Sequence, residues 1–163
     1  MMTAGRVTIR QATSSADMEI ARVLFLEYAE WLQIDLCFQG FAQELATLPG
    51  AYAPPDGRLL LAGDATPVGC VALRRLSADP TGTACELKRL WVRPSFRGQA
   101  LGRALAEAAL AAARAIGYSQ MKLDTLPAIM PGAVALYRDL GFTNCAPYYH
   151  NPISGSLYME CSL

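Results

Sequence analysis

A strand–turn–helix segment at residues 89–105 constrains the fold of this chain more than any other part of the sequence. An apolar run at Leu90–Val92 leads through a proline turn into the loop Arg97–Arg103, and an alanine-rich stretch follows. The first turn of a helix leaves backbone N–H groups unpaired, and these donors and the helix dipole together favour an anion. The loop also carries two glycines, which allow a ligand to approach closely, and two arginines. We therefore expect a phosphorylated ligand at this loop.

Two common phosphate-binding motifs are absent from this segment. No lysine follows Gly102, so the loop does not fit the P-loop pattern, in which GxxxxGK precedes Ser or Thr. It does not fit the dinucleotide pattern GxGxxG either. A strand–helix turn without any ligand is the alternative that the residues alone leave open.

The loop resembles the signature of the GNAT superfamily of acyl-CoA-dependent N-acyltransferases, R/Q-x-x-G-x-G/A at a strand–helix junction. Arg97, Gln99, Leu101 and Gly102 match this signature. Ala100 stands where the family usually has a glycine.

A second element of the same family, LYxxxGF, occurs at Leu136–Phe142. The two elements are separated by an expected helix, strand, loop and helix, in the order typical of the family. The resemblance covers residues 83–163 well, and the N-terminal half only through the order of its elements. It implies a mixed α/β fold, a GNAT-like three-layer α/β/α sandwich with splayed central parallel strands, as a single domain over residues 1–163.

Hydrophobic periodicity and turn residues predict the secondary structure along the chain. The mixture of strands and helices is typical of a sheet that is covered on both faces. We expect strands at 7–11, 58–62, 68–76, 85–92, 121–126, 142–146 and 157–162, and helices at about 15–34, 41–48, 98–116 and 133–140.

The composition excludes several other classes of protein. With 14 basic and 14 acidic residues the chain has no net charge, which argues against a nucleic-acid partner. The five cysteines are scattered without a CxxC pair, so we expect no metal site and reduced thiols. The sequence shows neither an uncharged apolar run of about 18 residues nor a secretory signal, so we expect no membrane partner and a cytoplasmic location. A homodimer is an open expectation for the assembly.

The family resemblance implies acetyl-CoA as the co-substrate. It implies that the pantetheine arm pairs with the backbone of Leu90, Trp91 and Val92, and that an N–H there polarises the thioester carbonyl. The pyrophosphate is expected on the loop, where a positive φ at Ala100 would cost about 1 kcal/mol or more. The expected loop contacts are Arg97, Gly98, Gln99, Ala100, Leu101, Gly102 and Arg103.

Tyr137 matches the family tyrosine that often faces the CoA sulfur, so the resemblance implies that it protonates the leaving thiolate. The alternative is a packing residue on an amphipathic helix. Family members often carry an asparagine seven residues earlier, where this chain has Met130. A polar anchor for the cofactor arm is therefore missing.

Glu86 lies in a strand otherwise patterned for burial, where a carboxylate either faces a cleft or pairs with a cation. Some family members place a base on the matching strand, so we expect Glu86 to be catalytic, with a structural salt bridge from Glu86 to Lys88 or to neighbours of Arg89 as the alternative. His150, the only histidine, and a water relay are the other candidates for the base. The expected acceptor-binding residues are Tyr28, Trp31, Glu86 and His150.

These residues together predict an N-acetyltransferase that moves an acetyl group from acetyl-CoA to a primary amine of a small molecule. The amine is expected to attack directly in a ternary complex. Cys85 as a covalent nucleophile is a rival mechanism, although the sequence gives it no paired base. A non-catalytic acyl-CoA-binding sensor and a protein Lys or N-terminal acetyltransferase are the alternative functions.

Overall fold

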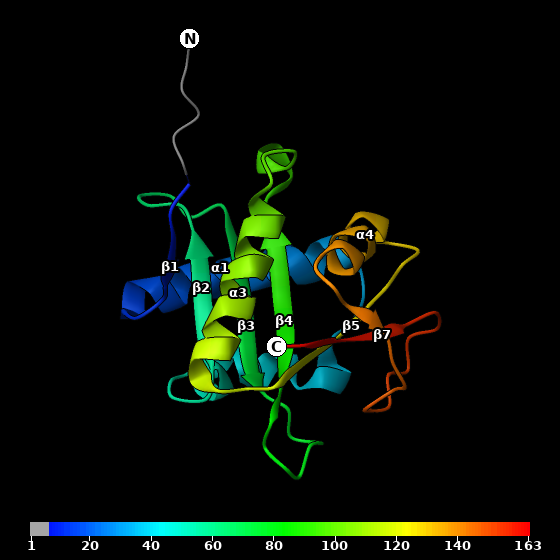
Figure 1. Ribbon diagram of the computed structural model, residues 1–163. Coiled ribbons are helices and arrows are strands. Elements are labelled where there is room, and N and C mark those ends of the chain that lie inside the picture. The colour runs from blue at the N-terminus through cyan, green and yellow to red at the C-terminus, as the bar shows by residue number, and fades with distance from the viewer. Residues whose placement is uncertain (1–6) are drawn as a thin grey trace.

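The computed structural model describes residues 7–163, which form a seven-stranded mixed β-sheet with helices on both faces (Figure 1). Neighbouring strands follow the order β1-β2-β3-β4-β5-β7-β6, and the central pair, β4 and β5, is parallel. The expected single domain over 1–163 includes a segment, 1–6, that lies outside the described residues. The strands are β1 (Ile9–Gln11), β2 (Arg58–Ala62), β3 (Gly69–Arg75), β4 (Ala84–Val92), β5 (Gln120–Thr125), β6 (Thr143–Asn144) and β7 (Leu157–Ser162).

The helices form the outer two layers of the fold. Helix α3 and the Tyr137 side of α4 pack on one hydrophobic core, whereas α1 and α2 pack on a second core across the sheet. This arrangement confirms the predicted three-layer α/β/α sandwich. The helices are α1 (Ser15–Leu32), α2 (Phe41–Ala46), α3 (Leu101–Ile116) and α4 (Pro131–Asp139), with short 3₁₀ turns η1 (Cys37–Gln39), η2 (Gly50–Tyr52) and η3 (Pro94–Phe96).

Both ends of helix α1 are set by local interactions or local backbone conformation. The Ser14 hydroxyl accepts from the Asp17 N–H at 3.1 Å, and the Asp17 carboxylate accepts from the Ser14 N–H at 3.2 Å. This reciprocal capping box satisfies two donors of the first turn. At the other end Gln33 has a left-handed backbone with φ 54°. The predicted end at Ile34 is therefore two residues too late.

Helix α3 begins three residues later than its pattern predicts. Gly98 and Ala100 both have positive φ, 81° and 59°, so neither can belong to a right-handed helix. The helix starts at Leu101 and ends at Ile116, and it is capped by Gly117, whose φ is 110°. The loop therefore bends sharply just where it meets the helix.

Strands β4 and β5 diverge after a short parallel ladder (Figure 1). Their pairing runs only from Ala84 opposite Gln120 to Glu86 opposite Lys122. Beyond this point β4 continues alongside β3 and β5 continues alongside β7. This separation confirms the predicted splayed central strands.

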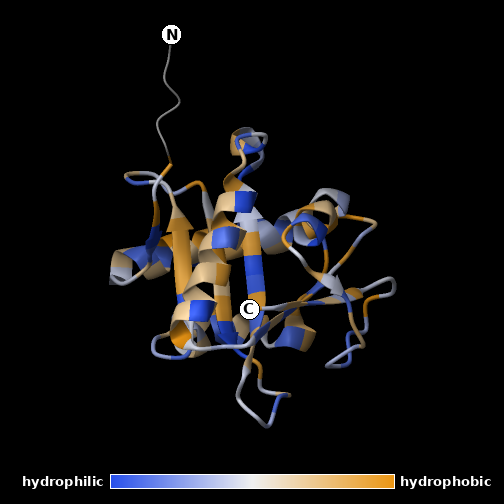
Figure 2. Cartoon of the chain, in the orientation of Figure 1, coloured by the Kyte–Doolittle hydropathy of each residue, from blue (hydrophilic) through white to orange (hydrophobic). Residues whose placement is uncertain are grey.

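Strand β4 also contains a β-bulge. Cys70 pairs with Trp91 and Ala72 pairs with Lys88, so β4 carries one more residue than β3 across this interval. Within the bulge Arg89 has φ 60°. A bulge disturbs the alternation of side chains along a strand. The side chains of Lys88 and Arg89 therefore both reach the α2 side of the sheet. Figure 2 shows this part of β4 as hydrophilic.

The remaining predicted elements are present, and their ends differ from the predicted ends by at most two residues. The strand predicted at 142–146 is reduced to Thr143–Asn144. Its first residue, Phe142, instead donates its N–H to the carbonyl of Tyr137 at 2.9 Å, which closes the end of α4. The Phe142 side chain is buried in the core on the α3 side.

Candidate functional site

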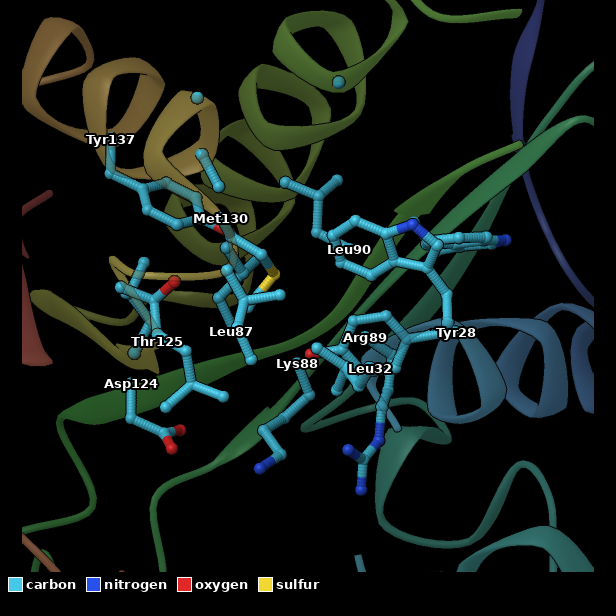
Figure 3. A pocket seen from close by; sticks show the side chains of 18 of the residues that line it. Tyr28, Leu32, Leu87, Lys88, Arg89, Leu90, Asp124, Thr125, Met130 and Tyr137 are labelled. Carbon is cyan, nitrogen blue, oxygen red and sulfur yellow. The ribbon is translucent and has the colours of Figure 1, made fainter. Parts of the chain in front are cut away.

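A pocket of about 630 Å³ opens where β4 and β5 diverge (Figure 3). Its walls come from α1, both splayed strands, the loop before α3, and α4 with the segment that precedes it. Most of the residues predicted for the site contribute to this lining. They are Tyr28, Trp31, Leu90, Trp91, Val92, Arg97, Gly98, Ala100, Leu101, Gly102 and Tyr137.

Four predicted residues do not line the pocket. Gln99 and His150 are exposed. The Arg103 guanidinium is paired with Asp139 at 2.6 Å on the surface. The fourth, Glu86, is buried and is absent from the pocket lining. Contacts of Gln99 and Arg103 with the cofactor, and of His150 with the acceptor, stay predictions.

The loop end of the pocket has the features of an anion site. The N-cap of α3 makes no side-chain hydrogen bond, so the first-turn N–H groups of this 16-residue helix lack a capping side chain. The N-cap residue is Ala100, and its φ is positive. This is the conformation that was expected to cost an alanine about 1 kcal/mol or more. Within the described part of the chain, a Cβ built on Gly98 meets nothing within 4 Å, and one built on Gly102 lies 3.8 Å from Leu136 Cδ2. The loop backbone therefore has open space in front of it, as a phosphate requires.

Tyr137 projects from α4 into the pocket, and its ring extends toward Met130 (Figure 3). The ring also packs against Phe142, with 5.7 Å between centroids. Burial raises the pKa of the Tyr137 phenol, so the hydroxyl stays protonated at neutral pH. Tyr137 therefore packs against the core with its ring and also contributes a protonated hydroxyl group to a side chain that lines the pocket.

Glu86 has its carboxylate engaged on both oxygens. Arg74 donates to Oε1 from Nε and Nη2, each at 3.0 Å, and the Tyr148 hydroxyl donates to Oε2 at 2.8 Å. The ion pair that the sequence left as an alternative is therefore present. Its cation comes from the neighbouring strand β3 rather than from the surroundings of Lys88 or Arg89.

Asp124, near the end of β5, is a pocket residue that sequence reasoning missed. Its Oδ2 accepts hydrogen bonds from the Tyr149 hydroxyl and from Asn151 Nδ2, the latter at 3.0 Å. Within residues 7–163 its Oδ1 has no hydrogen-bond partner. Its place in the sequence could have indicated this role, because Asp124 lies at the carboxyl end of a predicted strand. Ligands commonly bind at the carboxyl ends of strands in open α/β sheets.

Lys88 is a second missed residue, and it lies at the same end of the pocket as Asp124 (Figure 3). The residue is only 6% exposed, and its ammonium donates to Gln39 Oε1 at 3.1 Å. Burial lowers the pKa of Lys88. By contrast, the adjacent Arg89 is fully paired with Glu44 through two bonds of 2.8 and 3.0 Å. The sequence contained one indication of this role, since Lys88 is a charged residue within a strand otherwise patterned for burial.

The cysteines lie away from the pocket lining. Burial raises the pKa of the Cys85 thiol to about 12, which disfavours its nucleophilic thiolate. Cys85 also lies fully buried in the core on the α3 side. The arrangement therefore gives no support to a covalent intermediate on this residue.

Residues 18–142 match the Acetyltransferase (GNAT) family, and the chain belongs to this family. It is 38% identical to an uncharacterized N-acetyltransferase of Schizosaccharomyces pombe, over 100% of this chain and 99% of that protein. A GNAT-family acetyltransferase from Staphylococcus aureus has the same fold, with a TM-score of 0.77 and 18% identity over 96% of this chain and 99% of the other.

A further fold relative is the yncA protein of Salmonella typhimurium, solved with acetyl-CoA. Its TM-score is 0.67 at 18% identity, over 97% of this chain and 94% of the other. Family membership confirms the predicted enzyme class, an acyl-CoA-dependent acetyltransferase, and acetyl-CoA as its expected co-substrate. Among the described residues no helix is both long and apolar enough to span a membrane. A cytoplasmic location and a homodimer stay predictions.

Proposed function

We propose that this enzyme transfers an acetyl group from acetyl-CoA to a primary amine of a small molecule, by direct attack in a ternary complex. One observation carries the proposal: a single pocket joins the loop before α3 to the polar end at Asp124 and Lys88. The Tyr137 side chain lines the same pocket. A donor that enters from the loop and an acceptor held at the polar end would meet within this one cavity.

The donor would be held mainly by backbone groups. The N-terminus of α3 and the Arg97 guanidinium would bind the pyrophosphate. Among residues 7–163, strand β4 has no ladder partner on the β5 side beyond Glu86, so Leu90–Val92 can pair with an extended pantetheine arm. This supports the backbone role proposed for these three residues and requires no particular side chain from them.

In the reaction the amine nitrogen bonds to the acetyl carbon and the carbon–sulfur bond breaks. A backbone N–H of β4 would stabilise negative charge on the carbonyl oxygen. The protonated Tyr137 hydroxyl would donate a hydrogen bond, and then a proton, toward the sulfur as charge develops there. The hydroxyl matters most when the sulfur is charged, so its main effect is on the rate rather than on binding.

The amine must also lose a proton. Asp124 lines the pocket, and its Oδ1, which has no hydrogen-bond partner among residues 7–163, would accept this proton directly or through a water molecule. Glu86, the base expected from the sequence, has both oxygens engaged by Arg74 and Tyr148. We therefore propose Asp124 as the proton acceptor and retain Glu86 as the competing candidate.

The proposal is tested by incubating the protein with acetyl-CoA and either a panel of small-molecule primary amines or, in a second arm, a panel of peptides, while free CoA is measured. We expect CoA release and an acetylated amine for at least one compound, and no acetyl-cysteine when acetyl-CoA is supplied alone. Turnover only with peptides would favour the protein-modifying alternative. Tight acetyl-CoA binding without turnover in either arm would favour the sensor.

A further inference from the structure

We infer that the enzyme selects amines that also carry a carboxylate, and that Lys88 is the residue that binds this carboxylate. The inference rests on the proposed function and specifies its acceptor. It predicts a zwitterionic amino-carboxylate, such as a free amino acid, in preference to a simple alkylamine or an amino-acid amide.

The first support is the unfilled hydrogen-bonding capacity of Lys88. An ammonium has three donors, and within residues 7–163 only one is used, by the neutral amide of Gln39. No carboxylate of the described residues forms an ion pair with it. A buried charge without a counter-ion is costly, so an anion from the ligand would complete this site.

The second support is the contrast with the next residue in the strand. The bulge places Lys88 and Arg89 toward the same side, yet Glu44 neutralises only Arg89. Gln39, the partner of Lys88, is in turn bonded to the Tyr149 hydroxyl at 3.3 Å, so it is held in place as a neutral neighbour. Of these two adjacent buried cations, Arg89 has a counter-ion among the described residues and Lys88 has none, so Lys88 is available to an anionic group of a ligand.

The third support is the separation of charge at this end of the pocket. Asp124 and Lys88 both line it and project toward the same region (Figure 3). Tyr149 and Gln39 form a neutral bridge between them, through hydrogen bonds to Asp124 and to Lys88 respectively. An acceptor with its amine beside Asp124 and its carboxylate beside Lys88 would match both charges.

The test compares matched pairs of acceptors, L-leucine with L-leucinamide and 4-aminobutanoate with 4-aminobutanamide. The two pairs differ in the spacing between amine and carboxylate. We expect the wild type to favour at least one carboxylate over its amide by about tenfold or more in kcat/KM, about 1.4 kcal/mol. K88M should reduce this ratio to near one, and K88R, which keeps the charge, should retain a preference.

Lys122 provides the matched control, because it is the chain's other lysine and pairs with Glu160 at 3.5 Å outside the pocket. K122M should keep the preference. Equal use of carboxylates and amides by the wild type, or an unchanged ratio in K88M, would overturn the inference while leaving the proposed function intact. A fall in acetyl-CoA affinity in K88M, measured by calorimetry, would assign Lys88 to the donor and overturn it as well.

A second readout is independent of turnover. In the presence of CoA, L-leucine or 4-aminobutanoate should raise the melting temperature of the wild type more than the corresponding amide does. K88M should lose this difference. If no amine in any arm releases CoA, the proposed function fails, and this melting comparison alone then decides whether Lys88 binds a carboxylate.

Discussion

The Arg97 guanidinium lies over the Trp91 ring, with its central carbon 4.9 Å from the ring centroid. The same group lies 5.0 Å from the Trp31 centroid, and its Nε donates to the carbonyl of Val92 at 3.1 Å. These contacts hold Arg97, the first residue of the loop before α3, against α1 and β4. The loop geometry therefore depends on a planar side chain at position 97.

R97K should weaken acetyl-CoA binding although it preserves the charge. Lysine loses the planar stack, and exposed cation–π contacts contribute about 0.5–1 kcal/mol, so the dissociation constant should rise roughly two- to fivefold. Calorimetry measures this change. R138K, on the exposed side of α4, should leave the affinity unchanged. Equal affinity in R97K and the wild type would show that the stack does not order the loop.

A100G should stabilise the protein. Ala100 has φ 59°, a conformation that glycine adopts without strain, so the free energy of unfolding should rise by about 0.5–1 kcal/mol. Acetyl-CoA should also bind at least as tightly, because a methyl group is removed from the loop. Urea unfolding measures the first effect. A111G, at an exposed position inside α3, should instead lower the stability by about 1 kcal/mol. A destabilised A100G would contradict the strain argument.

G102D should weaken acetyl-CoA binding by about tenfold or more, about 1.4 kcal/mol, because it places a negative charge at the N-terminus of α3. G102A is the steric control, since a Cβ there meets only Leu136 Cδ2 at 3.8 Å. Calorimetry on both folded variants separates charge from bulk. Unchanged acetyl-CoA affinity in G102D would show that the pyrophosphate does not bind at this loop.

Y137F should lower kcat by about tenfold or more while the acetyl-CoA affinity changes far less. The substitution keeps the ring and its contact with Phe142 and removes only the hydroxyl. Y118F is the control, because that hydroxyl donates to the carbonyl of Asp56 away from the pocket. Full kcat in Y137F with a confirmed acceptor would make Tyr137 a packing residue.

D124N and E86Q separate the two candidates for the proton acceptor. D124N should lower kcat by about tenfold or more, since the amide cannot accept the amine proton. E86Q should mainly lower the melting temperature, because it leaves Arg74 without its counter-ion. Steady-state rates and thermal melts of both variants give the answer. A large loss of kcat in E86Q alongside normal rates in D124N would return the role to Glu86.

Local patterns in the sequence were enough to predict most of the fold. The β4–loop–α3 segment and the LYxxxGF element were assigned correctly because their turn residues and periodicity depend only on neighbours in the chain. The exact start of α3 was not predictable in the same way. It depends on the left-handed backbone of Ala100, and alanine carries no local preference for that conformation.

The polar end of the pocket depends on contacts that the sequence does not encode locally. Glu86 and Arg74 pair across β3 and β4, and their register follows from the whole sheet and its bulge. Asp124 and Lys88 come from two strands that pair for only part of their length. No spacing rule brings such residues together, so this site appears only once the strands are placed.

The separation of β4 and β5 gives the sheet two edges in its interior. Backbone groups on such edges are templates for pairing with another chain, which is how exposed strands promote aggregation. Here the gap forms part of the pocket, and α4 and the loop before α3 contribute to its walls, so an extended pantetheine arm bound there would pair with these edges. The co-substrate would therefore act as a removable strand. Its binding should protect these edges from self-association as well as prepare the enzyme for reaction.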